Sequence, residues 1–199
     1  RMRAEAVATM GTIVAGYPAK ADELGPKFKA VYEKYKKWNE KENAKFDKQI
    51  PKELLDQLMG TFNPWLYADK AYVASKVEQV ECYDDGDTGK KTEGEALAKL
   101  CEARTNQEDI MEFPVIAAWY NYMRGRAYAA TQNEAEAAKA WKEALDSPAE
   151  EMPPDQKKAV FALKKMILHD LIKMKMRAKK YSDVENAIVE AKVAPDLRS

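Results

Sequence analysis

The chain has 199 residues, of which 46% are hydrophobic and 33% charged, a composition that excludes an intrinsically disordered protein and favours a folded, soluble, mostly helical one. The 33 Lys and Arg residues equal the 33 Asp and Glu residues in number, so the net charge gives no general attraction to nucleic acid or to a membrane. No apolar run approaches the roughly 18 residues that a membrane-spanning helix needs, and we therefore expect no transmembrane segment.

The N-terminal part, residues 1–62, is predicted to be a helical segment of its own. Residues 2–17 have helical periodicity and end at Gly16–Pro18, and a second helix is predicted from Pro26 to about Lys48. Its apolar residues recur at the spacing of one buried helix face: Phe28, Val31, Tyr32, Tyr35 and Trp38. The opposite face is rich in lysine, which would allow contact with RNA, although aromatic residues at this spacing are more typical of a helix core.

Proline and glycine delimit the helices predicted between residues 51 and 104. The predicted elements are a short helix from Pro51 to Gly60, a helix from Asn63–Pro64 to Val80, a loop over residues 81–92 and a helix from Thr92 to about Arg104. Thr92 is expected to open the last of these helices because it has the spacing of a capping box with Glu95.

The stretch from Ala118 to Glu151 carries the most specific pattern in the chain. Its small and aromatic residues follow the spacing G-x2-Y-x8-A-x3-W-x2-A, formed by Gly125, Tyr128, Ala137, Trp141 and Ala144. A helix from Pro114, a polar turn at residues 131–133 and a second helix would bring Gly125 and Ala137 close together. Tyr128 and Trp141 would then fill the space beside them. This stretch resembles the tetratricopeptide repeat, a helix–turn–helix unit of about 34 residues.

Two other segments repeat the small–large–small spacing of the second helix in that stretch. They are Ala96, Leu100 and Ala103 upstream, and Val184, Ile188 and Ala191 downstream. Three preceding helices open with proline, at Pro64, Pro114 and Pro154. The predicted fold is therefore all-α: residues 63–199 form a tetratricopeptide-like α-solenoid of stacked antiparallel helical hairpins, preceded by the helical segment 1–62. An unrelated α-solenoid built on the same packing is the alternative.

The long helix predicted from Pro154 to about Lys179 has two apolar stripes. Val160, Leu163, Ile167, Leu171 and Met174 form one, and Phe161, Leu168 and Ile172 form the other. A helix that is apolar on two sides is typical of a stacked array, in which two neighbours bury it. A last helix is predicted to reach about Lys192.

The sequence contains no pattern of catalytic or cofactor-binding residues, and we expect neither an enzyme nor a bound cofactor. Gly-rich phosphate loops, nucleophile elbows and Cys/His clusters are missing, and His169 is the one histidine, which disfavours a metal site. Cys82 and Cys101 are expected to be reduced thiols, which slightly favours the cytoplasm. A disulfide between them would instead indicate a periplasmic or extracytoplasmic location.

The resemblance to tetratricopeptide proteins implies a binding function. In that family the first helix of each hairpin lines a concave groove that holds a peptide or a partner helix. At the matching positions this chain has Trp119, Tyr122, Arg126, His169 and Lys173. Aromatic anchors and basic groups suit an extended or acidic peptide, whereas the alternative for Trp119 and Tyr122 is burial between hairpins. Tyr122 and Arg126 replace the Lys and Asn of the family's carboxylate clamp, so the resemblance does not extend to chaperone-tail binding.

These patterns predict a scaffold or adaptor that binds a protein partner in a helical groove. The alternative is an assembly subunit that uses the same surfaces as permanent contacts and whose basic helices would contact RNA. Residues 154–180 have an excess of basic residues and residues 81–112 an excess of acidic ones. This difference in charge would also allow self-association from head to tail.

Overall fold

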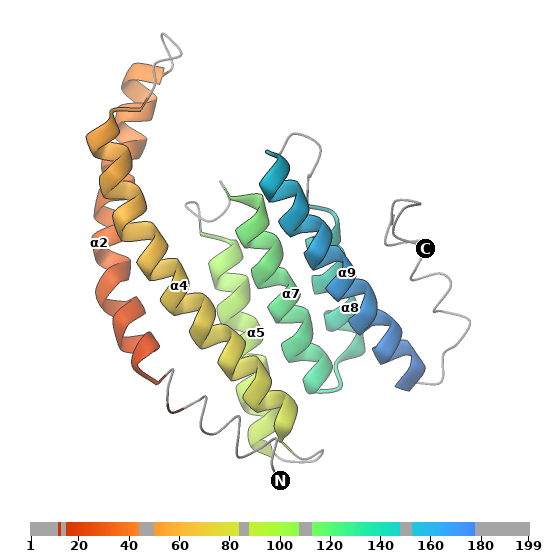
Figure 1. Cartoon of the computed structure of the whole chain (residues 1–199). Helices are drawn as coiled ribbons and strands as arrows, with labels where there is room; N and C mark the ends of the chain where they lie inside the picture. Colours follow the sequence, from red (N-terminus) through yellow and green to blue (C-terminus); the bar gives the residue numbers. More distant parts are fainter. Residues whose placement is uncertain are drawn as a thin grey trace. The chain divides into compact units, whose positions relative to one another are not determined.

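The computed structural model describes residue 12 and residues 15–43, 50–83, 88–107, 113–147 and 153–177, and every regular element in these ranges is a helix (Figure 1). The predicted all-α class is therefore confirmed. The chain divides into two compact units, residues 1–79 and residues 80–199, and each is described by itself. The predicted boundary between residues 62 and 63 lies inside one long helix. Most of the predicted first helix and the predicted last helix, with Val184, Ile188 and Ala191, lie outside the described residues.

Aromatic side chains hold the two long helices of the first unit together. Its described elements are α2 (Gly16–Trp38), the short π-helix η1 (Asn39–Asn43) and residues 52–79 of α4 (Lys52–Cys82). The ring of Phe28 in α2 stacks on that of Trp65 in α4 with centroids 5.5 Å apart, and its centroid lies 4.9 Å from that of Phe62. Phe28 and Tyr32 are buried, which confirms these two members of the predicted stripe as core residues.

Three of the helix breaks predicted in this unit are wrong. Pro26, Gly60 and Pro64 all lie inside α2 or α4, whereas α2 begins at Gly16, where the break over Gly16–Pro18 is predicted. A proline inside a helix removes a hydrogen bond and crowds the preceding turn, which costs about 3 kcal/mol. Phe62 and Trp65 flank Pro64 and are both 4% exposed, and burying a large apolar side chain contributes about 1.5–3 kcal/mol. Aromatic packing is therefore strong enough to keep α4 continuous through Pro64.

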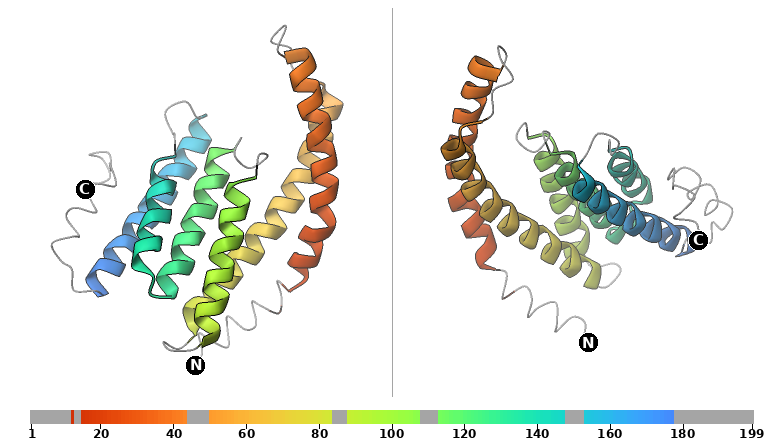
Figure 2. Two further views of the ribbon diagram at one scale, coloured as in Figure 1. Left: turned by 180° about the vertical axis from the view of Figure 1, so that it is seen from behind. Right: turned by 45° about the horizontal axis from the view of Figure 1, so that its top comes forward.

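Helix α7 is the centre of the second unit. The described helices of this unit are α5 (Thr88–Thr105), α7 (Pro114–Ala130), α8 (Glu134–Leu145) and α9 (Pro154–Arg177), together with the last turn of α4. α7 packs against α5, α8 and α9, and α8 also packs against α9. Figure 2 shows the green α7 between the yellow-green α5 and the teal α8. None of the 17 residues of α7 is fully exposed, so this helix supports the others.

The hairpin predicted in residues 114–145 is confirmed. α7 begins at Pro114, and α8 follows a turn at residues 131–133 in which Gln132 has a φ of 61°. Asn133 caps α8, because its side-chain oxygen accepts a hydrogen bond of 3.4 Å from the backbone N–H of Glu136.

α7 and α8 approach closely at Gly125, as predicted. The indole of Trp141 occupies the place where a Cβ atom of residue 125 would lie. Its Nε1–H donates a hydrogen bond of 3.1 Å to the backbone carbonyl of Tyr122, and Trp141 is 1% exposed. Ala137 and Ala144, which flank Trp141 on α8, are also buried. Because the indole fills that place, residue 125 must be glycine for this packing.

The loop before α5 is shorter than predicted. α4 continues to Cys82 and α5 begins at Thr88, so Thr92 lies within the helix instead of capping it. The Thr92 hydroxyl donates a hydrogen bond of 3.1 Å to the backbone carbonyl of Thr88, as a threonine inside a helix often does.

The packing face of α5 also differs from the prediction. Ala96 and Ala103 are exposed, and the buried residues with the same spacing are Gly94, Ala98 and Cys101. A Cβ atom at Gly94 would collide with the Thr131 side chain, so this face is the one in contact. The predicted register is therefore wrong by two residues. Alanine is compatible with either face of a helix, and its spacing alone cannot distinguish them.

The two apolar stripes of α9 have different surroundings. Val160, Leu163, Ile167, Leu171 and Met174 are buried, which confirms the first stripe as the core face. In the second stripe Phe161 is 41% exposed, and Leu168 and Ile172 are half-buried. The prediction that two neighbours pack on α9 agrees with its contacts to α7 and α8, but in the described part of the chain the second stripe is less buried than the first.

We expect Gly125→Ala to lower the free energy of unfolding by about 1–3 kcal/mol, because the added methyl group forces the Trp141 indole to move. Gly60→Ala is the matched control. No atom lies within 4 Å of a Cβ atom placed at Gly60, so this change should stabilise α4 by up to about 1 kcal/mol. Urea denaturation followed by circular dichroism measures both. A Gly125→Ala variant as stable as the wild type would contradict the close approach of α7 and α8.

Candidate binding site

Tyr122 and Arg126 of α7 lie together, one helical turn apart. The Tyr122 hydroxyl donates a hydrogen bond of 2.9 Å to Oδ2 of Asp170 in α9. The guanidinium carbon of Arg126 lies 5.8 Å from the centroid of the Tyr122 ring, which is within the range of a cation–π interaction. The structure thus brings two of the five predicted binding residues into direct contact.

Arg126 also forms a bidentate ion pair with Glu81 in the last turn of α4. Its Nε lies 2.9 Å from Oε1 of Glu81, and its Nη2 lies 2.7 Å from Oε2. The two side chains are 19% and 24% exposed. Burial would lower the pKa of Arg126, but the hydrogen bonds and the negative charge of Glu81 outweigh burial and raise the pKa. The guanidinium is therefore a permanent cation in a fixed orientation.

These contacts form a continuous line of polar groups across three helices, which we call the polar row: Glu81, Arg126, Tyr122 and Asp170. Burial, reinforced by the negative charge of Asp170, raises the pKa of Tyr122 well above its usual value. The Tyr122 hydroxyl therefore remains protonated at neutral pH and keeps its role as a donor. The polar row ties the end of α4 and the middle of α9 to α7.

Two members of the polar row, Glu81 and Asp170, were not predicted. Each lies more than forty residues from its partner in the sequence, with separations of 45 residues for Glu81–Arg126 and 48 for Tyr122–Asp170. A half-buried arginine needs a carboxylate partner, but this requirement does not say which of the many Asp and Glu residues supplies it.

A second arginine of α7, Arg124, joins α7 to α5 and α8. Its side chain is 8% exposed and contacts Glu143 of α8 through Nη2, while Nη1 lies 3.7 Å from Oε1 of Glu102 in α5. Its Nε has no hydrogen-bond partner. This cluster was not predicted either. Both carboxylates are much more exposed than Arg124. We therefore interpret this cluster as a link between helices.

The other three predicted binding residues differ in exposure. Trp119 is half-buried and packs edge-to-face on Tyr120, with ring centroids 5.1 Å apart. His169 and Lys173 on α9 are exposed, with 70% of the His169 side chain accessible, and Nδ1 of His169 lies 3.3 Å from Oδ1 of Asp170. Tyr122 is 3% exposed, so the alternative of burial between helices holds for this residue.

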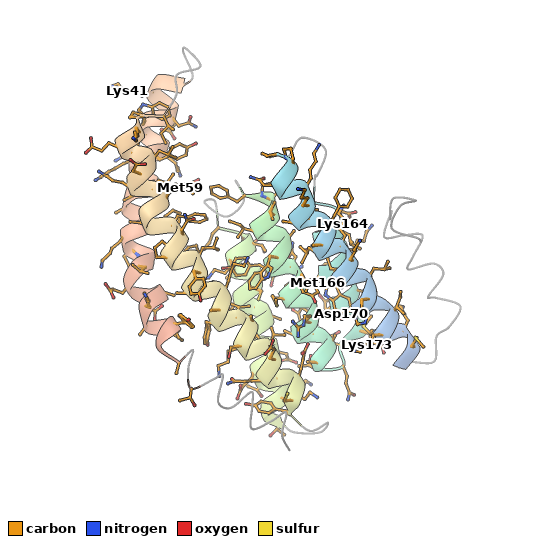
Figure 3. All side chains as sticks on the ribbon, in the orientation of Figure 1. Lys41, Met59, Lys164, Met166, Asp170 and Lys173 are labelled. Carbon is orange, nitrogen blue, oxygen red and sulfur yellow. The ribbon has the colours of Figure 1, made fainter. Side chains whose placement is uncertain are left out.

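An apolar side chain, Met166, is exposed on the same side of α9 as Asp170 and Lys173. Figure 3 shows these three residues along one edge of the helix, as expected from their spacing of four and three residues. Met166 is 47% exposed. The accessible groups beside the polar row are therefore a flexible thioether, an imidazole and an ammonium group.

The described residues offer no arrangement typical of a metal centre. Among them, no group of three or more His, Cys, Asp or Glu side chains is placed to hold a metal ion. Neither Cys82 nor Cys101 forms a disulfide, and Cys101 is buried. None of the described helices is long and apolar enough to cross a membrane.

Comparison with known proteins identifies no relative: no protein-family model, no curated protein and no solved structure matches this chain. The resemblance to the tetratricopeptide repeat therefore rests on the residues of the chain itself. Function must be inferred from the chemistry of the surface.

A double-mutant cycle on Arg126 and Glu81 should reveal a strong interaction. We expect Arg126→Met and Glu81→Gln each to lower the free energy of unfolding by about 1–3 kcal/mol, with a coupling of about 1–2 kcal/mol, because each change leaves a half-buried polar group without its partner. The matched control is Lys142 of α8 and Asp146, the residue that caps this helix, whose side chains are 76% and 53% exposed. Coupling of this exposed pair should be too small to resolve. An equally small coupling for Arg126 and Glu81 would show that the polar row does not tie the helices.

Proposed function

We propose that this chain is a non-enzymatic scaffold or adaptor that binds a peptide or helix of a protein partner on one face of α7 and α9. This α7–α9 face is made of Trp119, Tyr122 and Arg126 on α7 and of Met166, His169 and Lys173 on α9. One observation carries the proposal: an apolar and a basic side chain are exposed on α9, directly beside a polar row that holds this helix in place.

The order of helix contacts supports a tetratricopeptide-like array as the framework of this face. α7 contacts the preceding α5, its hairpin partner α8 and the first helix of the following segment, α9, and α8 also contacts α9. Stacked hairpins have this order of contacts, because each hairpin packs mainly on its neighbours in the sequence. In such an array the first helices of successive hairpins share one surface, and here these helices are α7 and α9.

The residues of the α7–α9 face have two different roles in this proposal. Tyr122 and Arg126 are largely buried and bonded to Asp170 and Glu81, so they position the surface and add little contact area. His169 and Lys173 are exposed and would contact the partner, together with the accessible part of Trp119. A fixed support under exposed side chains lowers the entropy lost on binding.

The chemistry of the exposed groups favours a peptide with an apolar side chain and a nearby carboxylate. Met166 is unbranched and adapts to apolar side chains of different shapes. Lys173 supplies a positive charge within one or two helical turns of it, which would pair with Asp, Glu or a C-terminal carboxylate. His169 adds a second positive charge only when it is protonated.

Photocrosslinking tests this function. A photoreactive amino acid at position 169 in the full chain should crosslink a polypeptide in a native extract, whereas the same residue at position 139 on α8 should not. Lys173→Glu should lower the yield of the crosslinked product about fivefold or more, because it places a negative charge beside the partner's carboxylate. Lys139→Glu, on an exposed position of α8, is the control and should change the yield little.

Two results would contradict the proposal. Equal crosslinking from positions 169 and 139 would show that no specific surface exists at the α7–α9 face. Capture that disappears after ribonuclease treatment would favour the alternative of an assembly subunit that contacts RNA through basic helices.

A further inference from the structure

The second apolar stripe of α9 is only partly covered within the described part of the chain. Phe161, Leu168 and Ile172 are separated by seven and four residues and lie on one side of the helix, away from the core stripe. Phe161 is 41% exposed, and Leu168 and Ile172 are half-buried. A lone exposed apolar residue is ordinary on a protein surface, but one exposed and two partly exposed apolar residues in one line on a single helix form a continuous contact surface.

Lysine residues border this stripe on both sides. Lys157 and Lys164 lie along one border, and Lys158 and Lys165 lie along the other. The two members of each pair are seven residues apart, which is about two helical turns, so they lie on the same side of the helix. Lys158 and Lys165 are exposed, and Lys157 and Lys164 are half-buried. We call Phe161, Leu168, Ile172 and these four lysines the lysine-bordered stripe.

The nearest carboxylate of known orientation on α9 points the other way. Asp170 is bonded to Tyr122 of α7 on the opposite side of the helix. In Figure 3 Lys164 lies along one edge of α9, and Met166, Asp170 and Lys173 lie along the other. The lysine-bordered stripe is therefore a separate surface from the α7–α9 face, and α9 presents one surface on each side.

We propose that the lysine-bordered stripe docks an amphipathic helix of a partner protein whose apolar residues are bordered by Asp and Glu. An apolar line about three helical turns long matches the i, i+3/i+4, i+7 anchors of a helix laid against another helix. Four lysines next to this line would meet the acidic borders of such a partner and reject a basic one.

Two other classes of ligand fit the stripe less well. A helix that lies on a membrane needs a wide apolar face, whereas the widest apolar face of α9 is already buried in the core. Single-stranded RNA gains affinity from aromatic side chains that stack on bases, and two of the three apolar side chains here are aliphatic. Among these ligands, another helix therefore fits the apolar part of the surface best.

Binding of two designed peptides to the full-length chain tests the proposal. Both are fluorescent amphipathic helices of about four turns with the same leucine stripe, one bordered by Glu and the other by Lys. Fluorescence anisotropy should show that the Glu-bordered peptide binds at least about tenfold more tightly than the Lys-bordered one. Phe161→Gln should weaken binding of the Glu-bordered peptide about tenfold, because Phe161 is the most exposed apolar anchor.

Reversing the charge of the lysine borders is the strongest test of the proposal. Lys164→Glu with Lys165→Glu should invert the preference, so that the Lys-bordered peptide binds more tightly. The matched controls lie on the opposite edge of α9: Met166→Gln and Lys173→Glu make the same chemical changes there and should alter peptide binding less than twofold. These controls change the α7–α9 face, whereas the border variants change the lysine-bordered stripe. A failure of the peptide test can therefore be distinguished from a failure of the crosslinking test.

Several outcomes would overturn the proposal. Binding that depends on Met166 and Lys173 but not on Phe161 would place the helix on the α7–α9 face instead. No binding of either peptide to the wild-type chain would show that the stripe does not dock an amphipathic helix. Binding of anionic vesicles or of a labelled oligouridine that is lost in the Lys164→Glu, Lys165→Glu variant, without peptide binding, would assign the lysines to a membrane or to RNA.

Discussion

Trp141 reaches the backbone of α7 because residue 125 has no side chain. The indole takes the space that a Cβ atom would occupy, and its N–H bonds to the carbonyl of Tyr122. This contact brings α8 close to α7 at Gly125, and the ion pair of Arg124 with Glu143 also joins the two helices. The orientation of α7 in turn decides where its polar side chains point, since the carbonyl that Trp141 holds belongs to the residue that contacts α9.

The arrangement around α7 explains why the exposed groups of this unit lie on its neighbours. α7 contacts α5, α8 and α9, and its two arginines are directed to carboxylates of other helices: Arg126 to Glu81, and Arg124 to Glu102 and Glu143. A helix enclosed in this way has little surface left for a partner. α9 buries its core stripe, and the apolar and basic groups that remain accessible lie on its other sides. The exposed groups of both proposed binding surfaces therefore lie mainly on α9, while α7 provides the rigid support and the accessible part of Trp119.

Local sequence patterns predicted those parts of the fold that depend on local chemistry. The hairpin of α7 and α8 follows from a proline at the first position, a polar turn and a glycine opposite a tryptophan. The core stripe of α9 follows from its periodicity. Both features require particular residue types at particular spacings, and few other arrangements satisfy them.

The incorrect and missing predictions also have physical causes. Pro26, Gly60 and Pro64 are helix breakers by propensity, but buried aromatic contacts between α2 and α4 outweigh that preference. The register of α5 was missed because alanine does not distinguish one face from another. The partners of Tyr122 and Arg126 were missed because a contact between residues more than forty positions apart leaves no local signal. Tyr122 and Arg126 were selected by a family resemblance, and the structure shows them engaged with Asp170 and Glu81.

α7 is the enclosed helix around which α5, α8 and α9 pack. Native-state hydrogen exchange can test this arrangement, because amides in the most enclosed element exchange only when the whole unit unfolds. We expect amides between residues 118 and 127 of α7 to exchange more slowly than any in α5, α8 or α9. If amides of α9 or α5 were protected longer than those of α7, α7 would not be the centre of the unit.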